Sequence, residues 1–378
     1  MRSSFASTLL SFFAVSLTVP ALVSAADTCN GHSELCDRKY SNVTFIGAHN
    51  SYGNGDSIAD NQNKDVTAQL DDGVRTLQLQ AHNTDAGVHL CHSSCSLLDG
   101  GSLEDYLKKV VSWISSNPND VVTIVLTNPE NLAVSTFSPI LTSAGIADYM
   151  YTPSASSLAL SDWPTLGELI DQKKNVVAFL DYQADFSSEP RLIDEFSNMF
   201  EDAYDVTDAS FSCAVNRTSG DASSQMMLIN HFLDTSYAFG GTSFWVPNKD
   251  ELNTTNAASG DGSIGFHVGN CVSIWGRNPN HILLDYYDTT SNAPFNVAAT
   301  LNGVSAPTNT VTPGAVASST GSGSASGTAS ASGQTAKISS SSLSSAMRRI
   351  KLENGLGGAV VAVSVLAGVG MGVGAVLL

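Results

Sequence analysis

Short apolar runs alternate with helical stretches between residues 27 and 303, and this alternation constrains the fold more than any other feature. Seven runs have the length and composition of buried strands, at 43–47, 74–80, 88–91, 121–127, 176–181, 226–230 and 282–286. Residues 103–115 place apolar side chains at helical spacing, and residues 191–203 do so more weakly. Strands that alternate with helices predict parallel βαβ units and an α/β fold. Periodicity alone leaves both a doubly wound sheet and a barrel open.

Polar side chains gather where these apolar runs end. They are His49, Asn50, Gln78, Gln80, His82, His92, Asn128, Asp181, Asn230, His231 and Asp285. Any single one of them is compatible with a structural role. In an α/β barrel, however, the functional groups lie at the C-terminal ends of the strands. Their shared position therefore makes them the candidates for a functional site.

The N-terminal segment and a later low-complexity segment flank the predicted domain at 27–303. Residues 1–26 begin with Arg2, continue in an apolar run at 9–23 and end in small residues, which predicts a cleaved signal peptide. An uncleaved anchor is the alternative. Residues 304–345 consist mostly of Ser, Thr, Ala and Gly, and such a segment buries too little apolar area to fold. In a secreted chain this composition predicts an O-glycosylated stalk.

Residues 346–378 have the composition of a C-terminal lipid-anchor signal. Small residues at 344–346, a polar spacer and the uncharged apolar block at 357–378 follow one another in the order that a glycosylphosphatidylinositol signal requires. A transmembrane helix is the alternative. It would place Arg348, Arg349 and Lys351 on the lumenal side, against the positive-inside rule. We therefore expect a protein on the extracellular face of the plasma membrane or in the cell wall.

The cysteines and glycosylation motifs agree with the secretory route. All six cysteines fall within 27–303, and an even count in an oxidising compartment predicts three disulfides. Spacing suggests Cys29–Cys36, Cys91–Cys95 and Cys213–Cys271, although fifteen pairings are formally possible. A zinc site is the alternative, which the compartment disfavours. Predicted N-glycosylation acceptors are Asn42, Asn216 and Asn253. The formal net charge of −18 argues against nucleic acid and against electrostatic docking on anionic lipid.

Three consecutive segments carry a family resemblance. Residues 47–52 (GAHNSY), 73–80 (GVRTLQLQ) and 88–93 (VHLCHS) are similar to the X-region of phosphatidylinositol-specific phospholipases C. Later segments resemble a fungal-type extracellular branch of that superfamily, at 122–131, 179–182, 228–232 and 283–287. The resemblance covers nearly all of 27–303. It implies a single-domain, irregular TIM-like (β/α) barrel.

The resemblance also implies roles for three residues. In this family an inositol hydroxyl attacks phosphorus and expels diacylglycerol, so one group removes a proton and another supplies one. Imidazole suits both tasks because its pKa lies near neutrality. Matching the motifs makes His49 the general base, His92 the general acid and Asp285 the residue that orients His49. Arg75 and His89 have the opposite strand parity, and we expect them to be structural, with Arg75 in a buried ion pair.

The chain departs from the family where negative charge must be stabilised. Mammalian-type relatives bind calcium there, and bacterial types use an arginine of the second strand. Here the corresponding residues are Asn50, Gln78, Gln80 and Asn128. Because calcium affinity depends on carboxylates, we predict no cofactor, although a weak calcium site stays open. These amides and Asp181 are predicted to bind substrate, and His82, if protonated, would replace the missing cation.

These features favour a phosphoric diester hydrolase of phospholipase C type that acts on an inositol phospholipid or glycolipid. The alternative is a catalytically inactive surface or wall-associated barrel that acts as a binding module, since fold does not imply function. A glycerophosphodiester phosphodiesterase would share the barrel. It requires a His-Arg pair and a carboxylate pair, whereas this chain has His49-Asn50 and two glutamines.

Overall fold

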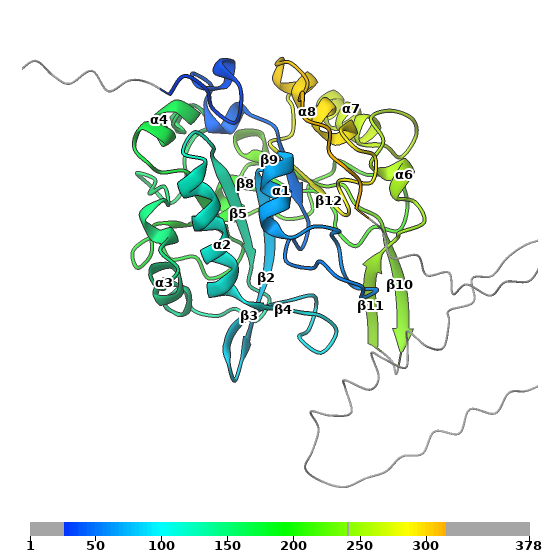
Figure 1. Ribbon diagram of the computed structural model, residues 1–378, viewed down its shortest axis with the longest axis horizontal. Helices are drawn as coiled ribbons and strands as arrows, with labels where there is room; N and C mark the ends of the chain where they lie inside the picture. Colours follow the sequence, from blue (N-terminus) through cyan, green and yellow to red (C-terminus); the bar gives the residue numbers. More distant parts are fainter. Residues whose placement is uncertain (1–25, 240–241, 315–378) are drawn as a thin grey trace, which may run out of the picture. The chain divides into compact units, whose positions relative to one another are not determined.

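Eight parallel strands form the central sheet of the computed structural model, which describes residues 26–239 and 242–314 (Figure 1). Their order is β7-β6-β5-β2-β1-β12-β9-β8, and each neighbouring pair is parallel. The bounds are β1 (Phe45–Ala48), β2 (Thr76–Thr84), β5 (Val122–Thr127), β6 (Val176–Leu180), β7 (Leu192–Asp194), β8 (Met199–Glu201), β9 (Met226–Asn230) and β12 (His281–Leu284). The sheet curls into the irregular α/β barrel that the resemblance implied. Within the described residues, no pairing joins β7 to β8.

Helices connect the strands and pack on the outside of the sheet (Figure 1). They are α1 (Val66–Asp72), α2 (Leu103–Ser116), α3 (Val134–Ser143), α4 (Leu166–Asp171), α5 (Glu195–Asn198), α6 (Leu252–Thr255), α7 (Ile264–Trp275) and α8 (Ala293–Asn302), with 3-10 turns at Ser33–Leu35, Tyr40–Asn42, Ile146–Asp148, Leu160–Asp162 and Ala222–Ser224. The predicted helix at 103–115 is confirmed as α2. The Ser102 side chain caps it by accepting from the Asp105 N–H, and its apolar face is buried.

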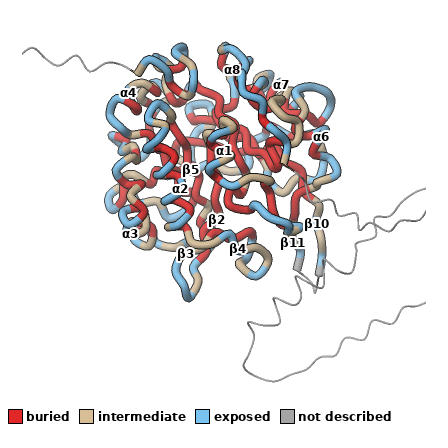
Figure 2. The backbone as a smooth tube through the Cα atoms, in the orientation of Figure 1, coloured by how far each residue is buried: buried red, intermediate tan, exposed pale blue. Residues whose placement is uncertain are grey.

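Side chains alternate between the two faces of each barrel strand, so the apolar residues form one cluster on each face of the sheet. The cluster inside the barrel includes Phe45, Val125, Val177, Phe179, Leu228 and Leu283. The cluster between the strands and the helices includes Ile46, Leu77, Ile124, Ala178 and Ile282. Figure 2 shows buried residues concentrated along the strands. A residue that lies two or four positions beyond one of these inward-facing residues, past the C-terminal end of its strand, therefore faces the mouth of the barrel.

Two antiparallel hairpins accompany the barrel. Strands β3 (Gly87–Cys91) and β4 (Asp99–Ser102) extend the end of β2. Strands β10 (Asp234–Phe239) and β11 (Thr242–Pro247) form a separate two-stranded ribbon. Both hairpins lie toward the lower end of the view in Figure 1, where β2 ends. The sequence did not predict the β10–β11 hairpin, and it placed 88–91 among the buried strands between helices rather than in a hairpin.

Residues 191–203 do not form the predicted helix. They contain β7, the single turn α5 and β8 instead. The buried apolar residues of this segment are Leu192, Ile193, Phe196, Met199 and Phe200. Their positions i, i+1, i+4, i+7 and i+8 are a helical spacing. Two three-residue strands around one helical turn thus reproduce the pattern of a helix.

The folded chain also continues past the predicted boundary at Gly303. Val311 is buried in the outer cluster, and its N–H donates to the Asn292 side chain. The Gly314 N–H donates to Asp288. The remainder of the predicted stalk, the predicted signal peptide up to residue 25 and the predicted anchor signal lie outside the described residues. No helix among the described residues is both long and apolar enough to cross a membrane.

The disulfide prediction is confirmed, with bonds Cys29–Cys36, Cys91–Cys95 and Cys213–Cys271. The three predicted glycosylation acceptors, Asn42, Asn216 and Asn253, are all exposed. Arg75 forms the predicted ion pair, in which Nε and Nη2 donate to Asp120 at 3.0 and 2.8 Å, although the pair is half-buried and not buried. Exposure of the asparagines is compatible with glycosylation, which stays a prediction.

Candidate active site

Strand alternation brings the predicted site residues together at the C-terminal mouth of the barrel. His49, Asp181 and Asp285 each lie two or four residues beyond an inward-facing residue of the same strand. Gln78 lies two residues beyond Thr76, whose hydroxyl contacts His281 of β12. Gln80 continues the set along β2. The mouth encloses a cavity of about 250 Å³. Its lining includes His49, Asn50, Gln78, Gln80, His92, Ser93, Asp181, Glu201, Tyr204, Asp205, Arg217, Asn230, Phe232, Asp234 and Trp245.

His49 is held in one orientation by its neighbours. Its Nδ1 lies 2.9 Å from Asp285 Oδ1, and its ring stacks on Phe232 with centroids 3.9 Å apart. Asp285 Oδ1 also accepts from Asn61 Nδ2 at 2.8 Å. Since a carboxylate oxygen only accepts, Nδ1 carries the proton in neutral His49. Nε2 therefore keeps its lone pair, which faces Asn50 Nδ2 at 3.1 Å. This is the tautomer that a general base requires.

His92 lies across the same cavity, with its ring centroid 6.4 Å from that of His49. Its Nδ1–H donates to the Ala59 carbonyl at 2.8 Å, which leaves Nε2 as the titrating atom. Burial lowers the pKa of His92, and the nearby charge of His49 lowers it further. His92 is therefore mostly neutral at neutral pH in the free protein. It becomes a proton donor when a neighbouring anion stabilises the imidazolium.

The cavity contains a cation that the sequence did not reveal. The Arg217 guanidinium lies between the rings of Tyr204 and Phe196, 4.5 and 5.2 Å from their centroids. Its Nε and Nη2 both donate to Glu201 Oε2. Burial opposes its charge, but the carboxylates of Glu201 and Glu195 outweigh burial and raise the pKa of Arg217. Nη1 makes no hydrogen bond within the described residues.

Buried carboxyl groups surround this arginine. Burial, reinforced by the charge of Glu201, raises the pKa of Glu195 far above its usual range. Burial raises the pKa of Asp181 to about 6. The pKa of Asp234 is also raised, first by burial and then by the charges of Asp285 and Asp205. Burial thus opposes negative charge on all three of these carboxyl groups, and Glu201 is the carboxylate paired with Arg217.

The four amides at the family's calcium positions do not fit a calcium ion. Each amide oxygen already accepts a hydrogen bond from the protein. Asn50 accepts from the Tyr52 hydroxyl, Gln78 from the Asn50 N–H, Gln80 from the Ser93 N–H and Asn128 from the Leu132 N–H. Calcium takes six to eight oxygen ligands, and its affinity depends on their charge, which these four neutral side chains do not supply. These amides brace the loops of the barrel mouth instead.

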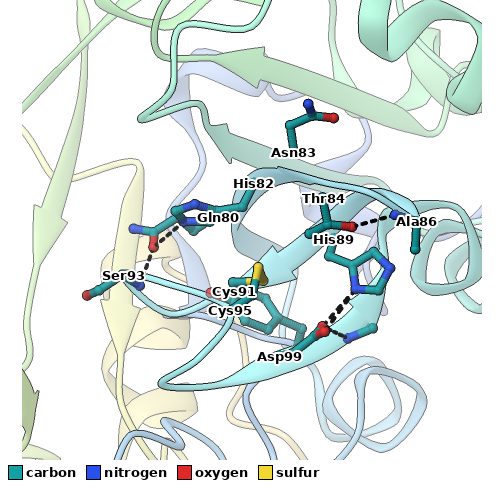
Figure 3. The surroundings of a disulfide bond; sticks show 12 residues. Gln80, His82, Asn83, Thr84, Ala86, His89, Cys91, Ser93, Cys95 and Asp99 are labelled. Carbon is teal, nitrogen blue, oxygen red and sulfur yellow. Dashed lines mark hydrogen bonds and ion pairs between the residues drawn. A yellow bond between two sulfur atoms is a disulfide. The ribbon is translucent and has the colours of Figure 1, made fainter. Parts of the chain in front are cut away.

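Two predicted substrate-binding residues do not line the cavity. His82 lies between Gln80 and Glu130, with contacts of 3.1 and 3.0 Å, and Figure 3 shows Gln80 joined to both His82 and Ser93. Asn128 donates to the carbonyls of Leu132 and Tyr182. Both side chains therefore support the loops around the cavity. His89 does not line the cavity, and its Nδ1 contacts Asp99 on the neighbouring strand (Figure 3).

Several cavity residues escaped the sequence analysis. Arg217 follows no recognisable strand and is brought in by its pairing with Glu201 at the end of β8. Asp205 lies near enough to both His49 and Arg217 for their charges to act on it. Phe232 stacks on His49 from a loop, and Asn61, outside the cavity lining, contacts both His49 and Asp285. Phe232 could have been predicted, because the Asn230-His231-Phe232 segment directly follows a predicted buried strand.

Comparison with known proteins places the chain in a family. The family model described as PI-PLC X 1 matches residues 35–302. "PI-PLC X domain-containing protein 1" of Arthroderma benhamiae is 44% identical over 293 residues, which are 76% of this chain and 94% of that protein. An "Uncharacterized secreted protein" of the same organism is 44% identical over 283 residues, which are 73% of this chain. The chain spans 64% of the length of this second relative.

Solved structures with a similar chain course include the phosphatidylinositol-specific phospholipase C from Listeria monocytogenes. It is 14% identical, with a TM-score of 0.47, and the match covers 73% of this chain and 96% of the bacterial chain. The phosphatidylinositol-specific phospholipase C from Staphylococcus aureus, in its F249X mutant form, is 12% identical, with the same TM-score of 0.47 and coverage of 71% and 95%.

Proposed function

Because the chain belongs to the PI-PLC X family of phospholipase C-like phosphodiesterases, we propose that it is a phosphoric diester hydrolase that cleaves an inositol phospholipid or a glycolipid with the same head group. One observation carries the proposal. A histidine with a free Nε2 lone pair, held by Asp285, faces a second histidine across one cavity, with the ring centroids 6.4 Å apart. This arrangement supplies the base and the acid that intramolecular phosphoryl transfer requires.

In the first half-reaction, His49 Nε2 takes the proton of an inositol hydroxyl. The hydroxyl oxygen then bonds to phosphorus while the bond from phosphorus to the glycerol oxygen breaks. The Asp285 carboxylate, 2.9 Å from Nδ1, stabilises the imidazolium that forms. Asn50 Nδ2, which contacts Nε2 in the free protein, gives way to the substrate hydroxyl.

His92 protonates the departing glycerol oxygen through Nε2. This role requires the imidazolium, which burial disfavours in the free protein. The phosphodiester is an anion, and its arrival in the cavity raises the pKa of His92. Substrate binding and acid activation are thereby coupled. After the cyclic phosphodiester has formed, His49 is protonated and His92 is neutral. These are the protonation states needed for water to open the cyclic phosphodiester.

Arg217 stabilises the negative charge on the phosphoryl oxygens. Gln80 stands where bacterial types have an arginine. Arg217, from the segment after β8, replaces that missing cation. Glu201 and two aromatic rings fix the guanidinium, and Nη1 is left for an oxygen in the cavity. A preorganised charge of this kind contributes to catalysis because it does not reorganise during the reaction.

The proposal extends to location. The predicted signal peptide and anchor signal, together with a relative described as secreted, support a secreted protein with a glycolipid near residues 344–346. The exposed acceptors Asn42, Asn216 and Asn253 support glycosylation. Mass spectrometry of the mature protein tests the anchor. A recovered peptide that ends in Leu378 would contradict it.

Purified protein incubated with labelled phosphatidylinositol tests the activity. We expect labelled cyclic inositol phosphate and diacylglycerol. If the protein binds inositol lipid vesicles but releases no labelled phosphate from them, the binding-module alternative replaces this proposal.

A further inference from the structure

A second cavity lies at the end of the barrel opposite to the candidate active site. Its volume is about 270 Å³, and three segments that are far apart in the sequence line it. Residues 39–44 lead into β1, residues 160–161 belong to a 3-10 turn, and residues 277–280 lead into β12. Because β1 and β12 are paired and parallel, their N-terminal ends lie side by side. The cavity is therefore at the base of the barrel, whereas the candidate active site is at its mouth.

The charge of this cavity differs from that of the protein as a whole. The chain has 35 Asp and Glu residues against 17 Lys and Arg residues, yet the described residues that line the cavity include Lys39 and Arg277 and no carboxylate. Arg277 donates to the Ala222 carbonyl through Nη2 at 2.8 Å, and its Nε and Nη1 make no hydrogen bond within the described residues. Lys39 Nζ lies 4.0 Å from Glu168, which is too far for a hydrogen bond. The cavity therefore offers N–H donors to a ligand that is rich in oxygen.

Asn42 connects this cavity with a ligand of that kind. Its side chain lines the cavity and is exposed, and residues 42–44 form an N-glycosylation motif. A glycan attached to Asn42 therefore begins at the cavity wall. Leu160 and Pro279, which also line the cavity, supply apolar surface for the C–H face of a sugar ring.

The size of the cavity limits what it can hold. Small-molecule sites typically have volumes of about 300–1,000 Å³, so a cavity of about 270 Å³ suits one sugar ring better than a larger ligand. A free sugar would bind weakly to so few polar groups. A sugar attached to Asn42, however, has an effective concentration on the order of millimolar, so weak contacts are enough to hold it in place.

We propose that this cavity binds the first N-acetylglucosamine of a glycan on Asn42. The proposal rests on the predicted glycosylation of Asn42 and is independent of the proposed hydrolase activity. The sugar ring packs on Leu160 and Pro279, and its hydroxyl and N-acetyl oxygens accept from Lys39 and Arg277. The bound sugar thereby joins three segments at the base of the barrel and stabilises the fold.

The test uses the full chain, secreted from a host that adds N-glycans, and compares Asn42→Gln with the matched control Asn253→Gln. Asn253 is also an exposed acceptor, but it lines neither this cavity nor the active-site cavity. Mass spectrometry measures the occupancy of both acceptors. We expect Asn42→Gln to lower the midpoint of thermal unfolding by about 2 °C or more, and Asn253→Gln to change it by less than about 1 °C. Amide hydrogen exchange at 160–161 and 277–278 should become faster in Asn42→Gln alone.

Two further measurements separate the first sugar from the rest of the glycan and from a general effect of glycosylation. Trimming the wild-type glycans to their first sugar with an endoglycosidase should leave the midpoint unchanged. Leu160→Ser, which removes apolar cavity wall, should lower the midpoint more in the glycosylated wild type than in Asn42→Gln, because only the former has a sugar contact to lose.

Four results would overturn the proposal. They are a secreted protein in which Asn42 carries no glycan, a trimmed wild type as unstable as Asn42→Gln, hydrogen exchange at 160–161 and 277–278 that is the same with and without the Asn42 glycan, and equal effects of Leu160→Ser in the two backgrounds.

Discussion

Removing the Cys213–Cys271 disulfide should destabilise the protein far more than removing Cys91–Cys95. The two bonds span 58 and 4 residues of sequence. In the chain-entropy account, closing the longer loop restricts the unfolded chain by about 4 kcal/mol and closing the shorter loop by about 2 kcal/mol. The long loop contains Arg217 and the β10–β11 hairpin, so the bond also tethers the segment that supplies the cation of the cavity.

Urea unfolding of two double alanine variants measures this difference. Both variants delete two sulfur atoms, and because Cys213 and Cys271 are both buried whereas Cys95 is half-buried, lost packing adds to the difference in the same direction as loop length. We expect the free energy of unfolding to fall by about 2 kcal/mol more for Cys213→Ala with Cys271→Ala than for Cys91→Ala with Cys95→Ala. Equal losses, or a larger loss for the shorter loop, would refute the reasoning from loop closure.

Three predictions concern the site. Arg217→Gln should lower kcat by about 10²-fold or more because a preorganised charge is lost, whereas Arg191→Gln, which breaks an ion pair outside the cavity, should leave kcat unchanged in the same assay. Chelation of calcium should leave most activity in place, and activity that disappears and returns with added calcium would contradict the conclusion that the four amides do not form a calcium site. Because burial lowers the pKa of His92 below 6.5 and the acid acts when protonated, kcat/KM should fall as pH rises through that lowered pKa. A pH profile whose alkaline limb lies well above pH 6.5 would count against His92 as the acid.

The site is predictable from sequence where it depends on strand ends. His49 and Asp285 follow the inward-facing residues Phe45 and Leu283 by four and two positions, so their place at strand ends marked them as candidates, whereas their roles came from the family resemblance. The barrel itself followed from the family motifs and not from periodicity. The cause is physical, since a parallel sheet buried on both faces has the same apolar pattern in a barrel and in an open sheet.

The rest depends on contacts that local sequence does not encode. Leu192 to Phe200 has helical apolar spacing, but its residues are buried in two short strands around one turn. Arg217 enters the cavity through a pairing with Glu201, and its segment has no strand-like pattern of its own. His82 has the parity of a site residue, yet Glu130 and Gln80 hold it outside the cavity. In each of these three examples, contacts with residues distant in the sequence determine the observed structure.

The assignment of separate roles to His49 and His92 is tested most directly by changing the leaving group. His49→Ala and His92→Ala should each reduce turnover of phosphatidylinositol by about 10²- to 10⁴-fold. His89→Ala, which alters an exposed pair with Asp99, is the control and should stay active. A substrate whose leaving group needs no proton should restore much of the activity of His92→Ala and none of that of His49→Ala. Equal rescue of both variants, or full activity in both on phosphatidylinositol, would contradict the account.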